Sequence, residues 1–261
     1  MCLILFAYDA HPGYRLILAA NRDEFYDRPA AALEFWKDHP QILAGRDLKM
    51  SGTWMGMTRQ GRIAAITNYR EPGSQNINAP SRGHLISDFL CSHRSAPAYL
   101  EKIKDSAHQY NGFNMLIGDS AALYYFSNRG SGAVALEPGV HGLSNHLLNT
   151  PWPKVANGRK RLAALLDSPE QRIFEGLTAL LQDREVAPDD RLPDTGVGYA
   201  TEKMLSPMFI ASPGYGTRCS TVLTVDRHQG VRMTELTWQP GHSPPVLHNK
   251  REFTFTIDRF A

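Results

Sequence analysis

The first 25 residues of the chain read MCLILFAYDAHPGYRLILAANRDEF. Two apolar runs rich in residues that favour strands, residues 3–8 and 14–19, lie on either side of a turn-forming segment, residues 9–13. This order of an apolar run, a short polar turn and a second apolar run predicts an antiparallel hairpin at the start of the fold.

The position of the turn predicts which residues of the hairpin lie opposite one another. If the turn is centred near His11, the numbers of opposed residues sum to 22, and Cys2 lies opposite Ala20. The polar residues 21–24 would then leave the second strand close to the Cys2 sulfur. A slip of one residue would turn every side chain of a strand to its other face, so the neighbourhood is better defined than the individual contacts.

Cys2 follows the initiator methionine, and its side chain is small enough for the enzymes that remove methionine. The processed chain would begin with a cysteine that carries both a thiol and a free α-amine, whose pKa is roughly 7.7–8.0. A neutral α-amine can accept the thiol proton and so activate the sulfur as a nucleophile. The alternative is that Cys2 is a small buried apolar residue and that residues 21–24 form a charged turn.

Composition limits the class of protein. The chain has 261 residues, of which 42% are hydrophobic and 21% charged, as in globular proteins, and we expect one domain over residues 1–261. A net charge of +2 without a basic run argues against nucleic acid as a partner. No apolar stretch is long enough to predict a transmembrane segment. Three widely spaced cysteines favour reduced thiols and a cytoplasmic location.

The rest of the chain alternates between predicted strands and helices. We expect strands at residues 52–58, 62–68, 113–117, 123–127, 134–136, 140–143, 221–225, 231–238 and 253–257, with residues 134–136 and 140–143 continuing one sheet. We expect helices after Ser81, at residues 95–104 and 153–166, and after Ser168. Residues 26–47 show no clean period, which predicts a packed surface loop, with a substrate lid as the alternative.

Polar residues follow several of these predicted strands. Asn68 and Asn145 each stand at a strand end, where a side-chain amide can donate to a developing oxyanion. Arg218 comes just before the predicted strand 221–225, where a guanidinium can hold a carboxylate or stabilise a thiolate. The alternatives are asparagines that close turns and an arginine at the surface. His146 is either a ligand or a surface residue.

Seven motifs occur in one order along the chain. They are Cys2, NRDEF (21–25), GTWMG (52–56), AITNY (65–69), YNGFN (110–114), GLSN with TPW (142–145 and 150–152), and PGYGTR (213–218). From Cys2 to about Phe255 this series resembles the NRDE family, also called the transport and Golgi organisation protein 2 family. That family in turn resembles N-terminal-nucleophile hydrolases of the penicillin acylase and bile-salt hydrolase kind.

The resemblance implies an α+β fold, a four-layer αββα sandwich of two antiparallel sheets. It also implies a set of site residues. Those with catalytic roles would be Cys2, Asp23, Asn68 and Asn145, and those that bind substrate would be Asn21, Arg22, Glu24 and Arg218. The spacing between the arginine and the aspartate is shorter here than in the hydrolases.

Two functions follow from the resemblance. The first is a cysteine hydrolase that cleaves an amide or thioester of a small acylated substrate, with Cys2 as nucleophile, Asp23 orienting its amine, and Asn68 and Asn145 binding the oxyanion. The second is a non-catalytic binding or transfer protein for haem or acyl-CoA. We expect no metal site and no required cofactor, with haem only as cargo, because the sequence has neither Cys-x-x-Cys-His nor paired histidines at ligand spacing.

Overall fold

The computed structural model describes residues 3–119, 121–240, 242 and 245–258, so Cys2 lies outside the described residues. The chain forms two compact units. Unit 1 consists of Met1–Asp27, Pro138–Ser144 and Leu148–Thr254, and unit 2 consists of Arg28–Glu137, Asn145–Leu147 and Phe255–Ala261. Each unit is built on its own seven-stranded sheet. Neither unit is a continuous stretch of sequence.

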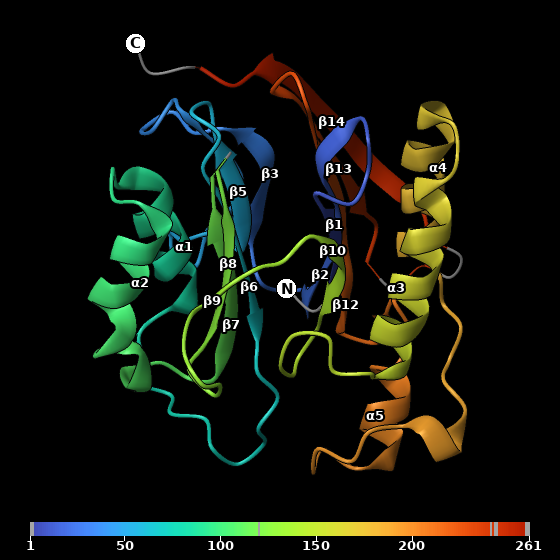
Figure 1. Ribbon diagram of the computed structural model, residues 1–261. Coiled ribbons are helices and arrows are strands. Elements are labelled where there is room, and N and C mark those ends of the chain that lie inside the picture. Colours follow the sequence, from blue (N-terminus) through green and yellow to red (C-terminus); the bar gives the residue numbers. More distant parts are fainter. Residues whose placement is uncertain (1–2, 120, 241, 243–244, 259–261) are drawn as a thin grey trace. The chain divides into compact units, whose positions relative to one another are not determined.

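The sheet of unit 1 has the strand order β10-β1-β2-β12-β13-β14, with the short β11 paired to β12 (Figure 1). Its strands are β1 (Leu3–Tyr8), β2 (Tyr14–Phe25), β10 (Gly139–Leu143), β11 (Ala211–Ser212), β12 (Tyr215–Asp226), β13 (Gly230–Trp238) and β14 (Leu247–Thr256). The predicted first hairpin is present, and β1 lies in the interior of the sheet between β10 and β2.

The register of this hairpin differs from the prediction by two residues. Leu3 lies opposite Asn21 and Tyr8 opposite Leu16, so the numbers of opposed residues sum to 24 and not to 22. The turn itself explains the shift, because the His11 ring accepts hydrogen bonds at Nδ1 from the backbone N–H groups of Gly13 (3.0 Å) and Tyr14 (3.2 Å). This contact moves the centre of the turn to Pro12. A shift of two leaves each side chain on its expected face.

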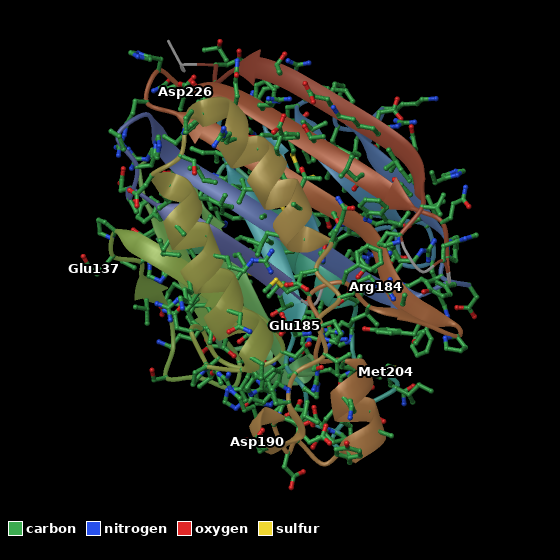
Figure 2. The ribbon with its side chains drawn as sticks, turned by 90° about the vertical axis from the view of Figure 1, so that its right-hand side faces the viewer. Glu137, Arg184, Glu185, Asp190, Met204 and Asp226 are labelled. Atoms are coloured by element: carbon green, nitrogen blue, oxygen red, sulfur yellow. The ribbon has the colours of Figure 1, made fainter. Side chains whose placement is uncertain are left out.

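Two long helices, α3 (Pro153–Leu166) and α4 (Glu170–Leu181), pack on one face of this sheet. Figure 2 shows them side by side across the strands, with Asp226 marking the β12–β13 turn. Apolar side chains from alternate positions of β1 and β2, such as Leu5 and Ile17, meet Leu162 and Leu177 of the helices in one buried cluster. A short helix α5 (Tyr199–Met204) and a 3-10 turn, η2 (Asp189–Arg191), follow α4.

The sheet of unit 2 is a meander in which each strand pairs with the next along the chain, β3 to β9. The strands are β3 (Ala30–Phe35), β4 (Ile42–Asp47), β5 (Met55–Thr58), β6 (Ile63–Asn68), β7 (Phe113–Gly118), β8 (Leu123–Ser127) and β9 (Val134–Ala135). The first two correct the prediction of a loop over residues 26–47. β3 is an edge strand with an irregular register between Ala31 and Glu34, and this irregularity removes the two-residue period expected of a strand.

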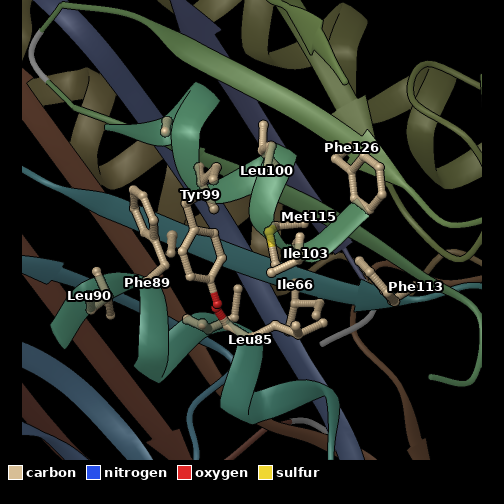
Figure 3. Close-up of a cluster of buried hydrophobic side chains, with 14 of the residues drawn as sticks. Ile66, Leu85, Phe89, Leu90, Tyr99, Leu100, Ile103, Phe113, Met115 and Phe126 are labelled. Carbon is tan, nitrogen blue, oxygen red and sulfur yellow. The ribbon is translucent and has the colours of Figure 1, made fainter. Parts of the chain in front are cut away.

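Helices α1 (Arg82–Cys91) and α2 (Ala96–Lys104), with the 3-10 turn η1 (Ala107–Gln109), pack on the sheet of unit 2. Figure 3 shows the cluster that they form with the strands. Phe89 of α1 and Tyr99 of α2 meet edge to face at 5.2 Å between ring centroids, above Met115 of β7. Full burial of a side chain such as Phe89 contributes about 1.5–3 kcal/mol, so this cluster stabilises unit 2 as a core of its own.

The predicted continuation of one sheet through residues 134–136 and 140–143 is wrong. Val134–Ala135 pairs with β8 in unit 2, whereas β10 pairs with β1 in unit 1. Gly139, the first residue of β10, has φ = 155°, a conformation that L side chains rarely adopt. The predicted α+β class, two antiparallel sheets with helices packed on them, is confirmed.

Candidate functional site

The end of β2 in unit 1 presents successive polar residues to opposite faces of the sheet, because side chains alternate along a strand. Asn21 shares the helix-covered face with Ile17 and Ala19. Arg22 points to the other face, where it lies in register with Cys219 of β12. Asn21 and Arg22 therefore take part in different sets of contacts, although they are neighbours in sequence.

Asn21 is fully buried and its carboxamide is fully engaged. Nδ2 donates to the backbone carbonyls of Leu181 and Met208, each at 2.8 Å, and Oδ1 accepts from the Ser220 hydroxyl at 2.6 Å. Ser220 in turn accepts from the Trp238 indole N–H at 2.9 Å. These bonds tie β2 to the end of α4 and to β12, which is a structural role.

Asp23 is also buried, opposite Thr217 of β12. The Thr217 hydroxyl donates to Asp23 Oδ1 at 2.6 Å and accepts from the Ile210 backbone N–H at 2.9 Å. Threonine thus orients the Asp23 carboxyl group through a short, well-directed bond. A carboxylate held in this way can itself orient a neighbouring amine.

Arg218 lies inside β12, not just before a strand as the sequence predicted. Thr217 pairs with Asp23 and Cys219 pairs with Arg22, so Arg218 is the additional residue of a β-bulge. Bulges redirect side chains and occur often beside functional sites. The Arg218 guanidinium donates to the Phe25 carbonyl at 2.8 Å, beyond the polar part of β2.

Arg22 and Arg218 bring positive charge to the end of β2. Burial lowers the pKa of Arg218, and the positive charge of Arg22 lowers it further. The Arg22 side chain is only 4% exposed, and its Nη2 lies 3.9 Å from the Glu24 carboxylate, which is more open to solvent. Guanidinium groups held this way suit recognition of a carboxylate or phosphate.

Glu235 of β13 is a residue that sequence reasoning missed. Its carboxyl group is buried, 2% exposed, and its negative charge adds to burial in raising the pKa of the Cys219 thiol. The positive charge of Arg22 acts to lower the pKa of the same thiol. One signal was available in the sequence, because Glu235 interrupts an otherwise uncharged alternate row that starts at Val231 and Met233. We call Arg22, Glu24, Arg218, Cys219 and Glu235 the charged cluster.

In unit 2 the structure brings together two asparagines that are 77 residues apart. Asn145 Nδ2 donates to the Asn68 carbonyl at 3.0 Å, at the end of β6. Arg70 holds Asn145 from the other side, with its backbone N–H donating to the Asn145 carbonyl at 2.7 Å. The Asn68 side chain is exposed. We call Asn68 and Asn145 the amide pair; one member is buried and fixed, and the other is open to solvent.

His146, next to Asn145, contacts Tyr69, next to Asn68. The Tyr69 hydroxyl lies 2.9 Å from His146 Nε2, and the two rings lie with centroids 4.9 Å apart and planes tilted by 37°. Burial lowers the pKa of His146, so the ring is neutral near pH 7. The contacts with Asn68, Tyr69 and Arg70 therefore attach residues 145–147 to the end of β6.

The described residues provide no evidence for a metal centre or a membrane span. No group of three or more His, Cys, Asp or Glu side chains among them is arranged to hold a metal ion. Within the same part of the chain, no helix is both long and apolar enough to cross a bilayer.

The chain is similar to one protein family along most of its length. Residues 1–240 match the family described as Transport and Golgi organisation 2. The chain is 39% identical over 259 residues to the cattle (Bos taurus) Transport and Golgi organization protein 2 homolog, with 90% of this chain and 92% of that protein covered. The human homolog is 38% identical over 256 residues, with the same coverage of both chains, 90% and 92%.

Solved structures with a related arrangement share little sequence with this chain. A Caenorhabditis elegans N-acylethanolamine-hydrolyzing acid amidase ortholog is 16% identical, with 85% of this chain and 92% of that chain covered and a TM-score of 0.46. A conjugated bile acid hydrolase from Clostridium perfringens is 10% identical, with 98% and 92% covered and a TM-score of 0.49.

Proposed function

The chain belongs to the Transport and Golgi organisation 2 family, and from this premise we propose that it is a cysteine hydrolase of the N-terminal-nucleophile type. The proposed substrate is an amide or thioester of a small acylated compound. The observation that carries the proposal is the amide pair, in which Asn145 is held by Asn68 and Arg70. Acyl transfer places negative charge on a carbonyl oxygen, and fixed N–H donors stabilise that charge.

The proposed reaction begins at Cys2 after removal of Met1. The thiol proton passes to the α-amine of the same residue, and the sulfur attacks the carbonyl carbon to form a tetrahedral oxyanion. Side-chain N–H groups of Asn68 and Asn145 donate to this oxyanion. Collapse breaks the bond to the leaving amine or thiol, which takes the proton from the α-ammonium group. Water then hydrolyses the thioester on Cys2, releasing the acid and restoring the thiol.

The charged cluster has a separate role in the proposal. Arg22 and Arg218 favour anionic species, either the Cys2 thiolate or an acidic group of the substrate, and Glu24 limits how strongly they do so. Asp23, oriented by Thr217, fixes the amine of Cys2. Asn21 acts in support of the strand and not on the substrate, because its donors are already used.

The proposal includes a setting for this chemistry. The reaction uses no cofactor, and the substrate is a small molecule. The odd number and wide spacing of the cysteines favour reduced thiols, which Cys2 needs, and hence the cytoplasm. Transfer of haem or acyl-CoA without turnover is the alternative that the test below separates.

The test is to trap an acyl group on Cys2. Full-length protein from its native host is first weighed intact, to establish whether Met1 is removed, and is then mixed with panels of N-acyl amides and acyl thioesters. We expect an adduct on Cys2 equal in mass to the acyl group. Cys2→Ala should abolish both the adduct and turnover while retaining binding, because the sulfur acts mainly in bond making.

Cys91→Ala is the matched control, since Cys91 is a half-buried thiol whose pKa is raised mainly by burial. This variant should keep both the adduct and the rate. If processed protein forms no adduct with any substrate of either panel, the hydrolase assignment is wrong. Tight binding of haem or acyl-CoA by that same protein would then establish the carrier function instead.

A further inference from the structure

We infer that Asn114 is a positioning residue for the amide pair, an inference that rests on the proposed function and adds a residue to its machinery. Asn114 belongs to the YNGFN motif and lies on β7, with no exposed surface. Its donors bond to the residues beside Asn68 and Asn145 and not to the side chains of the amide pair. It acts through the segments that carry them.

The Asn114 carboxamide makes three hydrogen bonds. Nδ2 donates to the Thr67 hydroxyl at 3.2 Å and to the His146 carbonyl at 3.1 Å. Oδ1 accepts from the Tyr125 hydroxyl at 2.8 Å. Because a phenol hydroxyl that donates must face the carboxamide oxygen, Tyr125 sets which side of the Asn114 group carries the two donors.

The two groups that receive these donors are the immediate neighbours of the amide pair. Thr67 precedes Asn68 on β6 and lies in register with Asn114. His146 follows Asn145 in the three-residue segment that joins unit 2. The buried Asn114 side chain thus supports both asparagines of the amide pair, Asn68 through Thr67 and Asn145 through His146.

The segment Asn145–Leu147 needs such support because it is not part of a strand. Besides the Asn114 bond, the segment has polar contacts with the Asn68 carbonyl, with the backbone N–H and guanidinium of Arg70, and with the Tyr69 hydroxyl. Displacing a catalytic donor by about 1 Å can reduce a rate on the order of 100-fold. Fixing this segment is therefore a kinetic requirement of the proposed reaction as well as a packing contact.

Asparagine is the residue type that satisfies these three partners. Aspartate of the same shape keeps an acceptor for Tyr125 but has no donor for the His146 carbonyl, and leucine has neither. Asn111 of the same motif offers a comparison, because its side chain accepts from the Asn76 backbone N–H at 2.8 Å and donates to the Asn76 carbonyl at 3.0 Å. Its bonds involve a different loop.

The kinetic test compares Asn114→Asp and Tyr125→Phe with Asn111→Asp in the full-length processed protein. We expect kcat to fall by about 10- to 100-fold in Asn114→Asp, with KM changed less than about 2-fold, and a smaller fall in Tyr125→Phe. Asn111→Asp should retain the wild-type kcat. Should Asn114→Asp not fold, Tyr125→Phe carries the comparison alone.

The decisive arm repeats the substitutions in an Asn145→Ala background. If Asn114 acts through the amide pair, its effect on kcat should be at least several-fold smaller there, since one of the two groups that it positions is gone and only Asn68 remains. An effect of unchanged size in both backgrounds would overturn the inference, because it would show general destabilisation.

A second readout does not depend on turnover. Hydrogen exchange of the Arg70 amide, which donates to the Asn145 carbonyl, reports how firmly the segment is held. Exchange should be at least several-fold faster in Asn114→Asp and Tyr125→Phe than in wild type and Asn111→Asp. Unchanged exchange in both variants would refute the positioning role. If exchange accelerates but wild type forms no acyl-enzyme, the positioning is upheld and the proposed hydrolase function fails.

Discussion

Asn21 near the end of β2 and Asn68 at the end of β6 are the same residue type in opposite surroundings. Asn21 in unit 1 is fully buried, and its carboxamide serves three partners. Asn68 in unit 2 is exposed, and it is its backbone carbonyl that Asn145 binds. The position of an asparagine at a strand end therefore does not define its role. What separates a structural amide from a candidate catalytic one is whether both of its N–H groups are already donated, as they are in Asn21; Asn145 donates one, to the Asn68 carbonyl.

The surroundings of the two strand ends also differ in kind. Unit 1 gathers ionisable groups around Arg22, Arg218 and Glu235, whereas in unit 2 the buried Asn114 carboxamide is held by the neutral side chains of Thr67 and Tyr125. Charges act over several ångströms and respond to salt and pH. Neutral hydrogen bonds act only at contact, and so they fix geometry. This contrast leads to three measurements.

The largest expected effect is on stability, in Asn21→Ala. The substitution leaves the carbonyls of Leu181 and Met208 buried without their donor and removes the acceptor of Ser220. Because each unsatisfied buried group costs about 1–3 kcal/mol, the free energy of unfolding should fall by about 3–5 kcal/mol. Urea titration measures this loss. A loss below about 1 kcal/mol would contradict the structural role given to Asn21.

The next effect is on rate, in Asn68→Ala. Loss of one oxyanion donor should lower kcat on the order of 10²–10³-fold, equivalent to about 2.7–4 kcal/mol of transition-state stabilisation. The free energy of unfolding should stay within about 0.5 kcal/mol of wild type, because the side chain is exposed. Steady-state kinetics and urea titration of the same preparation provide both values. The comparison breaks down if Asn68→Ala unfolds easily yet retains its rate.

The smallest effect is a pH dependence from His146. Burial lowers its pKa in the folded state below the unfolded value of about 6.5, so the unfolded chain binds more protons between these two values. The stability contributed by neutral His146 is complete above about pH 6.5 and is lost as the pH falls through the folded pKa. His146→Gln should therefore lose less stability than wild type between pH 7.5 and pH 5, as measured by urea titration at the two pH values.

Local sequence rules predicted helices α1 to α4 and most of the strands, but not the short helix α5. The helix over residues 153–166 has the predicted limits, because Pro153 at its start and the apolar positions Val155 and Leu162 are local signals. The prediction missed β3 because an edge strand of small residues with an irregular register has no clean period, and it missed β4, the partner of β3, with it. Which sheet residues 134–143 join depends on partners far away in the chain, and local rules contain no such information.

The site was predictable only in part, because local rules identify strand ends but not which strands pair. Strand ends identified Asn68 and Asn145 as candidates, and the structure joins them in unit 2. The register of β2 against β12 decides that Arg218 is a bulge residue and that Cys219 meets Arg22, and a pairing across nearly 200 positions cannot be read from either strand alone. Cys2 lies outside the described residues, and its role as nucleophile stays a prediction.

The pairing of β2 with β12 also governs when unit 1 can fold during synthesis. Ser220 binds Asn21 across 199 residues of sequence, so the central strand of that sheet has one neighbour missing until the last fifth of the chain is made. At roughly 5–20 residues per second, the wait is roughly 10–40 s. Through that interval the ribosome-bound hairpin presents an apolar strand with an open edge, the feature that most invites pairing with other chains. Translation pauses before residue 215 should accordingly lower the yield of folded protein, and pauses after residue 226 should not.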